Sequence, residues 1–120
     1  MTEPGPSVDP AALHRLLEMT GNDPAFLDEL IQTFLEDAVA QLEAMHAAAG
    51  ADSAVELLRP AHSLKSNSAN VGAEHLAELC RQLEADARAG AVERATERVV
   101  AAAAEFEQVR AELAALRTQK

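Results

Sequence analysis

The residues best suited to chemistry in this 120-residue sequence are His62 and Lys65, which stand in a segment without carboxylates. From Leu57 to Ala73 there is no Asp or Glu, although the chain has 20 acidic and 10 basic residues and a net charge of −10. An unperturbed imidazole has a pKa of ~6.5, so its ring nitrogen can act as a nucleophile at neutral pH. In so acidic a protein, a segment with cations alone is a candidate site for meeting an anion.

Helical spacing indicates which side chains accompany His62. At about 100° per residue, four residues fall within about 60° of it around a helix, and apart from the lysine they are small. They are Lys65, Ser66, Ala69 and Ala73. The opposite side of the same helix holds Leu57, Leu64, Ser68 and Val71. If that side faces a core, His62 points to solvent above a strip of small side chains, where another protein can reach it.

The composition predicts that helices position these residues. Of the residues counted as hydrophobic, 27 are Ala and 15 are Leu, whereas Trp and Tyr are absent. Ala and Leu favour helices, and pleated sheets favour β-branched and aromatic residues. We therefore expect an all-α domain.

Start signals, stop signals and apolar periodicity divide the chain into five expected helices. Asp9-Pro10 and Asp23-Pro24 each indicate an N-cap followed by proline at the first helical position. The link at 50–52 supplies the next cap, Pro60 should kink or split the third helix, and glycines end the first, third and fourth. The expected helices cover about 10–20, 24–49, 53–71, 73–88 and 92–116. Because short links make successive helices antiparallel, we expect an up-down four-helix bundle with the short first helix as a lid.

Composition also excludes several classes of function. The net charge of −10 disfavours binding to nucleic acid or to an anionic membrane surface. No apolar run approaches the ~20 residues that span a bilayer, and the N-terminus does not resemble a signal peptide. The single cysteine, Cys80, cannot form an internal disulfide, which favours a cytoplasmic location. We expect residues 1–8 to be a disordered lead and residues 9–118 to form one domain.

The segment around His62 resembles the histidine-containing phosphotransfer (Hpt) domain of bacterial two-component phosphorelays. The resemblance is dense over about 25 residues, from Ala61-His62-Ser63-Leu64-Lys65 through Gly72 to the stripe of Leu76, Leu79, Cys80, Leu83 and Glu84. The preceding segment, Phe26 to Leu35, is also similar to the second helix of the family. One departure is Ser66, which stands where the family often has glycine.

The resemblance implies a role for each matched residue. His62 would accept a phosphoryl group, Lys65 would neutralise the phosphoryl oxygens, and Glu84 would accept a hydrogen bond from the other ring nitrogen and so orient the ring. Gly72 would end the helix. The small residues Ser66, Ala69 and Ala73 would form a docking surface.

The resemblance further implies a phosphoryl carrier without an ATP-binding kinase domain and without a cofactor of its own. Its partners would be response-regulator receiver domains or a hybrid histidine kinase, and Mg²⁺ would belong to the receiver. The alternative is a helical adaptor that binds a partner through the same face without phosphorylation. We expect a monomer, although the seven-residue spacing of Val92, Val99, Phe106 and Leu113 leaves a coiled-coil dimer as a further alternative. The Met1 start and polar C-terminus favour a free-standing protein over a domain of a larger kinase.

The remaining reactive residue types have simpler explanations. His14, His46 and His75 have no spacing that places metal ligands on one helix face, so we predict no metal site. Cys80 lies on a leucine stripe and is predicted to be a core residue. Glu84 has an alternative partner, because Arg88 lies four residues further along the same helix.

Overall fold

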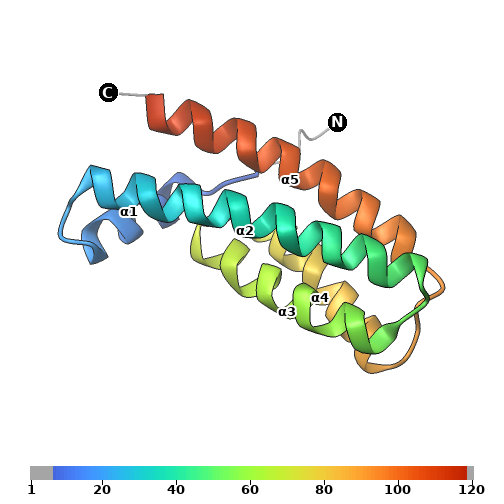
Figure 1. Ribbon diagram of the computed structural model, residues 1–120. Coiled ribbons are helices and arrows are strands. Elements are labelled where there is room, and N and C mark those ends of the chain that lie inside the picture. Colours follow the sequence, from blue (N-terminus) through green and yellow to red (C-terminus); the bar gives the residue numbers. More distant parts are fainter. Residues whose placement is uncertain (1–6, 119–120) are drawn as a thin grey trace, which may run out of the picture.

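The computed structural model describes residues 7–118, which form five helices and no strand (Figure 1). The helices are α1 (Pro10–Met19), α2 (Pro24–Gly50), α3 (Ala54–Asn70), α4 (Glu74–Arg88) and α5 (Ala95–Thr118). The all-helical prediction is confirmed.

Helices α2 to α5 pack around one core. Helix α2 contacts α3 and α5, and α4 contacts the same two helices, so the four contacts close a ring. Figure 1 shows α2 and α5 side by side on one side of the molecule and α3 and α4 on the other. The short helix α1 packs against α2.

The first two helices begin at the positions that their predicted N-cap residues indicated. Asp9 and Asp23 are N-caps whose carboxylates accept backbone N–H groups, and each precedes a proline. The prediction for the third start was wrong by one residue. Helix α2 continues through Gly50, so that Asp52 takes the left-handed conformation (φ 52°) and Ser53 becomes the N-cap, accepting from Glu56 N at 3.2 Å.

Two further boundaries differ from expectation. Pro60 was expected to kink or split the third helix. Helix α3 runs unbroken through Pro60, which lies buried inside it, so the helix is not split. Helix α5 begins at Ala95 rather than at residue 92, because residues 91–94 form the link after Gly90. Neither difference changes the face that each helix turns to the core.

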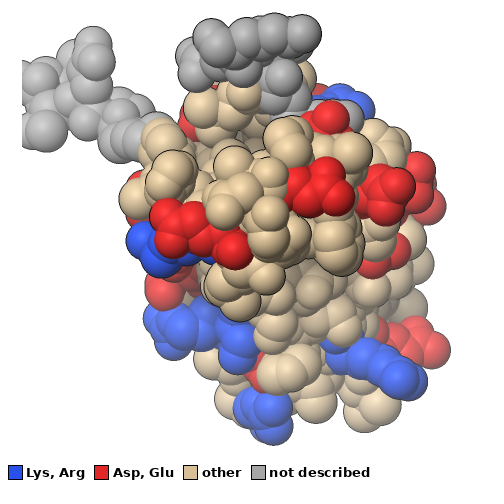
Figure 2. All heavy atoms as spheres, turned by 90° about the vertical axis from the view of Figure 1, so that its left-hand side faces the viewer, with Lys and Arg blue, Asp and Glu red and all other residues tan. Residues whose placement is uncertain are grey.

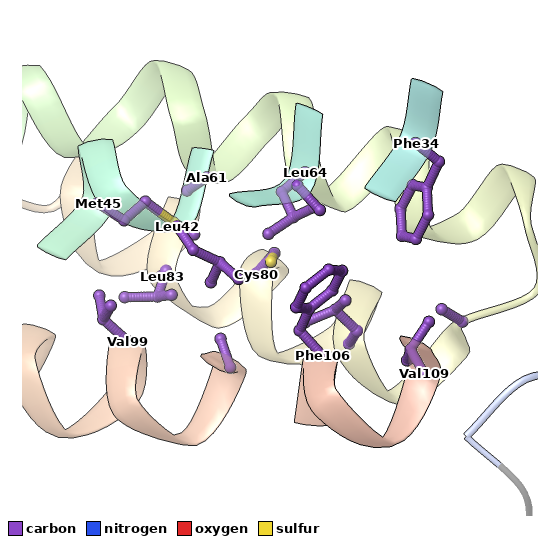
Figure 3. Packing of buried hydrophobic residues seen from close by; sticks show 14 of the residues in the cluster. Phe34, Leu42, Met45, Ala61, Leu64, Cys80, Leu83, Val99, Phe106 and Val109 are labelled. Carbon is purple, nitrogen blue, oxygen red and sulfur yellow. The ribbon is translucent and has the colours of Figure 1, made fainter. Parts of the chain in front are cut away.

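The core is formed by the predicted apolar stripes (Figure 3). Phe34 of α2 and Phe106 of α5 meet with their ring centroids 6.3 Å apart. Cys80 is fully buried, and burial raises the pKa of its thiol to about 12, so it behaves as an apolar core residue, as predicted. The repeat on α5 is buried through Val99, Phe106 and Leu113.

The chain before α1 is held against the far end of α5. The backbone N–H groups of Ser7 and Val8 donate to the two carboxylate oxygens of Glu112 at 3.0 and 2.9 Å, and the Val8 side chain is buried. Residues 1–6 of the predicted disordered lead lie outside the described residues. For Ser7 and Val8 that prediction was wrong, because hydrogen bonds and apolar burial order them.

Candidate functional site

His62 lies on the outer face of α3, as the helical spacing predicted. Leu57, Leu64 and Ser68 are completely buried on the opposite face of the helix, against the core. The side chain of His62 is 56% exposed. The apolar spacing of α3 therefore decides that the imidazole faces outward.

Gly72 makes the turn that places α4 beside α3. Its φ of 79° is left-handed, and the N–H groups of Gly72 and Ala73 bond back to the carbonyls of Ala69 and Ser68 at 3.1 and 2.8 Å. This is the Schellman pattern of helix ends, which favours glycine. A Cβ on Gly72 would stand 2.6 Å from the Cβ of Ala12, so the glycine also lets α1 approach the turn. Its predicted structural role agrees with this geometry.

The turn brings Glu84 of α4 to the ring of His62. The Glu84 side chain is only 6% exposed, and its Oε2 lies 2.8 Å from Nδ1 of His62. An ionised carboxylate can only accept hydrogen bonds, so Nδ1 carries the proton and donates it. The other ring nitrogen, Nε2, then keeps its lone pair, on a ring that is more than half exposed.

Glu84 also binds two cations. Its Oε1 lies 2.6 Å from Nζ of Lys65, and its Oε2 accepts from a terminal nitrogen of Arg88 at 2.9 Å. The sequence offered His62 and Arg88 as alternative partners for Glu84, and in the structure the carboxylate contacts both. The contact with Lys65 was not predicted, since helical spacing describes one helix and these residues come from two.

The surrounding donors keep Glu84 ionised. The hydrogen bond from Lys65, followed by those from Arg88 and His62, lowers the pKa of Glu84 from 4.5 to about 2, although burial acts in the opposite direction. The carboxylate therefore remains a hydrogen-bond acceptor for Nδ1 throughout the physiological pH range.

The predicted docking residues do not all reach the surface. Ser66 and Ala69 are exposed on the same side of α3 as His62, but Ala73 is completely buried. The prediction for Ala73 was wrong because α3 ends at Asn70, and the 100° spacing no longer applies beyond the turn. Ala73 is instead the N-cap residue of α4.

A groove begins beside Ala69. It has a volume of about 530 Å³ and lies between α1, α2 and the end of α3. Its apolar lining includes Leu16, Met19 and Phe34, and Arg15 and Asp37 add charge. The Met19 side chain is 81% exposed. The face of His62 thus continues into an open and largely apolar surface.

Charge is unevenly distributed over the molecule. Helix α2 contains no Lys or Arg, whereas Lys65 and Arg88 flank the site on α3 and α4. Figure 2 views the end at which α1 lies and shows most carboxylates above, toward α2 and α5, and most Lys and Arg below.

Within residues 7–118, no cluster of His, Cys, Asp or Glu is arranged to hold a metal ion. None of the helices there is long and apolar enough to cross a bilayer.

Comparisons with known proteins agree with this geometry. The family model of the Hpt domain matches residues 29–119. The crystal structure of histidine-containing phosphotransfer protein B (HptB) from Pseudomonas aeruginosa PAO1 is similar to this chain, with a TM-score of 0.87 and 33% identity. That match covers 98% of this chain and 99% of the other. No curated protein sequence gives a significant match. The chain belongs to the Hpt domain family.

Proposed function

We propose that His62 accepts a phosphoryl group from the aspartyl phosphate of a receiver domain and passes it to another receiver in a two-component phosphorelay. The hydrogen bond between Nδ1 and Glu84, at 2.8 Å, is the observation that carries this proposal. It leaves the lone pair of Nε2 on an exposed ring, aimed away from the buried carboxylate. Membership of the Hpt family supports the same function.

The transfer is a displacement at phosphorus. The lone pair of Nε2 forms the new N–P bond, and the bond from phosphorus to the aspartate oxygen breaks, its electron pair leaving as the aspartate carboxylate. The proton on Nδ1 stays in place, so the ring becomes positively charged and its bond to Glu84 strengthens. Transfer onward reverses these steps with a second receiver.

Positioning and charge neutralisation dominate such chemistry. Glu84 orients the ring and stabilises its developing positive charge. Lys65, one turn from His62 on α3, provides the positive charge for the phosphoryl oxygens. Its side chain is 32% exposed, so its ammonium group can reach an incoming phosphoryl group.

The receiver docks over the exposed side of α3. Ser66 and Ala69 are small and exposed, which supports close approach to His62. The groove beside Ala69 extends this surface toward α1. In the finer architecture that we propose, α2 to α5 form an antiparallel up-down bundle and α1 acts as its lid.

The protein is a phosphoryl carrier, because Hpt proteins relay phosphoryl groups rather than take them from ATP as kinases do. It needs no cofactor of its own, and Mg²⁺ belongs to the partner receiver. Hpt proteins interact with receiver domains and kinases, and we place this one in the cytoplasm as a monomer. The monomer is supported by the burial of Val99, Phe106 and Leu113, which a coiled-coil dimer would have to expose.

Labelling from a phosphorylated receiver tests the acceptor. Wild-type protein incubated with ³²P-phosphorylated receiver domains should gain label that is stable in alkali and lost in acid, as phosphohistidine is. His62→Gln should gain none. Its melting curve by circular dichroism should match wild type, because an exposed side chain contributes little to the core.

His46→Gln is the matched control, since His46 is an exposed histidine on α2. This variant should be labelled like the wild type. Label retained on His62→Gln would show that another residue is the acceptor. A wild-type protein that binds phosphorylated receivers without gaining label would favour the alternative, an adaptor that is not phosphorylated.

A further inference from the structure

The two carboxylate oxygens of Glu84 contact three donors, one at Oε1 and two at Oε2. Oε1 contacts Lys65 alone, at 2.6 Å, whereas Oε2 is shared by Nδ1 of His62 at 2.8 Å and Arg88 at 2.9 Å. The Glu84 side chain is 6% exposed and that of Arg88 is 63% exposed. A buried carboxylate thus has one cation on each oxygen, and only one of these cations shares the oxygen that orients His62.

This arrangement conflicts with the role proposed for Lys65. The ammonium group that should neutralise the phosphoryl oxygens is already bound to Glu84. When the phosphoryl group arrives at Nε2, the ammonium of Lys65 has to shift from Oε1 toward the phosphoryl oxygens, which weakens its pairing with Glu84. The ring of His62 gains its positive charge only as the N–P bond forms. Before that, a buried carboxylate without a cation is strongly destabilised, so without Arg88, Glu84 would hold Lys65 back.

We propose that Arg88 is a positioning residue that allows Lys65 to exchange its partner during phosphotransfer, an inference that rests on the proposed function. Arg88 stays on Oε2 and keeps Glu84 neutralised and aimed at Nδ1. Lys65 moves from Oε1 to the phosphoryl oxygens. A guanidinium is always charged and a carboxylate oxygen has two lone pairs, so Arg88 and Nδ1–H can share Oε2 throughout.

An ordinary surface ion pair would not have this effect. Arg81 and Glu78, on the same helix, form such a pair at 2.6 Å, with side chains 58% and 45% exposed. Water replaces either partner of that pair at little cost. Arg88 differs because its partner is buried and touches both His62 and Lys65.

Single-turnover transfer from a phosphorylated receiver tests the exchange. Arg88→Ala should lower the rate at saturating receiver about tenfold, the loss expected for one hydrogen bond to a charged group. The receiver concentration for half-saturation should not change, because Arg88 acts on Glu84 and not on docking. Arg88→Lys should recover part of the rate, and Arg81→Ala should transfer like the wild type.

The same substitution in the Glu84→Gln background separates the exchange from a general effect. A neutral amide needs no cation, so Arg88→Ala should cause no further loss there. In the unphosphorylated Arg88→Ala protein, ¹⁵N spectra should still show the proton of His62 on Nδ1, since Lys65 continues to neutralise Glu84.

Three results would overturn the inference: wild-type transfer by Arg88→Ala, an equal loss in the Glu84→Gln background, or a displaced proton in the unphosphorylated variant. A wild-type protein that takes no label would instead refute the proposed function, so the two failures are distinguishable.

Discussion

At the scale of single residues, the site is organised by one buried carboxylate. Glu84 is contacted by His62 and Lys65, which lie across from it on α3, and by Arg88 of its own helix α4. The carboxylate selects the protonated nitrogen of the ring, and the cations keep the carboxylate charged. The ring of His62, the proposed nucleophile, remains more than half exposed.

The lowered pKa of Glu84 predicts a pH dependence of stability. Lys65 first, then Arg88 and His62, hold this pKa at about 2 in the folded protein, against 4.5 ordinarily. A carboxyl group with a lower pKa when folded adds stability above its unfolded pKa and loses it as the pH falls to the folded value. The free energy of unfolding of the wild type, measured with urea, should therefore decrease from pH 4.5 to 2. The free energy of unfolding of Glu84→Gln should decrease less steeply over the same range.

The matched control for this measurement is Glu78→Gln. The pKa of Glu78 is also lowered to about 2, by its hydrogen bond to Arg81, but this pair is exposed and screened by solvent. Glu78→Gln should therefore change the pH dependence of the free energy of unfolding less than Glu84→Gln does. Parallel pH profiles for Glu84→Gln and the wild type would contradict the prediction.

At the scale of elements, the turn between α3 and α4 decides which residues meet. His62 lies ten residues before Gly72 and Glu84 lies twelve after it, so the two reach the same level of the helix pair. The backbone of Asp9 also bonds to this turn, through its N–H to the Gly72 carbonyl at 2.9 Å. The start of α1 and the site helices are thus joined at one glycine.

Substitutions of two glycines separate the cost of a left-handed backbone from the cost of a close contact with α1. Gly72 and Gly90 both have left-handed φ, 79° and 71°, so alanine at either should cost about 1–2 kcal/mol of stability. Only at Gly72 does the new Cβ meet a neighbour, 2.6 Å from the Cβ of Ala12, whereas the space at Gly90 is open. The close contact should destabilise Gly72→Ala by about 1–3 kcal/mol beyond the cost of the left-handed backbone.

Urea denaturation of the two variants measures this difference. The double variant Gly72→Ala, Ala12→Gly should recover part of the added loss, because it removes the Cβ that the new methyl group meets. Equal destabilisation of Gly72→Ala and Gly90→Ala would show that α1 does not pack on the turn in solution.

At the scale of the whole molecule, the face of His62 is distinct from the rest of the acidic surface. It combines small side chains on α3, cations on α3 and α4, and the groove that leads to α1. Helix α5 does not border it, because α5 packs against α2 and α4 on the other side of the core. We therefore expect a partner that docks beside His62 to pass over the small exposed residues Ser66 and Ala69.

Ala69→Arg tests this approach. Arginine is a good helix former and Ala69 is exposed, so the change should cost under about 1 kcal/mol of stability. The long side chain should nevertheless block docking and abolish phosphotransfer from a receiver. Ala104→Arg, at an exposed position of α5, is the matched control and should transfer normally. Normal transfer by a folded Ala69→Arg protein would mean that receivers approach along another path.

The sequence alone was enough to predict the helices and the face that each turns to the core. Periodicity determines angles around a helix axis, and on α3 it is sufficient to place His62 outside and Leu64 inside. Periodicity failed where a helix ended, because Ala73 belongs to the next element. The start signals also missed one cap, because Ser53 and not the link at 50–52 caps α3. Helix ends depend on the local competition of caps and left-handed residues, which periodicity does not describe.

Only the tertiary structure decided the partners of Glu84. The sequence placed this residue at the edge of an apolar stripe and left His62 and Arg88 as alternatives. Their joint contact with the carboxylate, and that of Lys65, depends on the depth at which α4 packs against α3. That depth is set by the turn at Gly72 and by the packing of side chains from several helices together. Contacts between helices are thus collective properties of the core, whereas the face of each helix is a property of its own sequence.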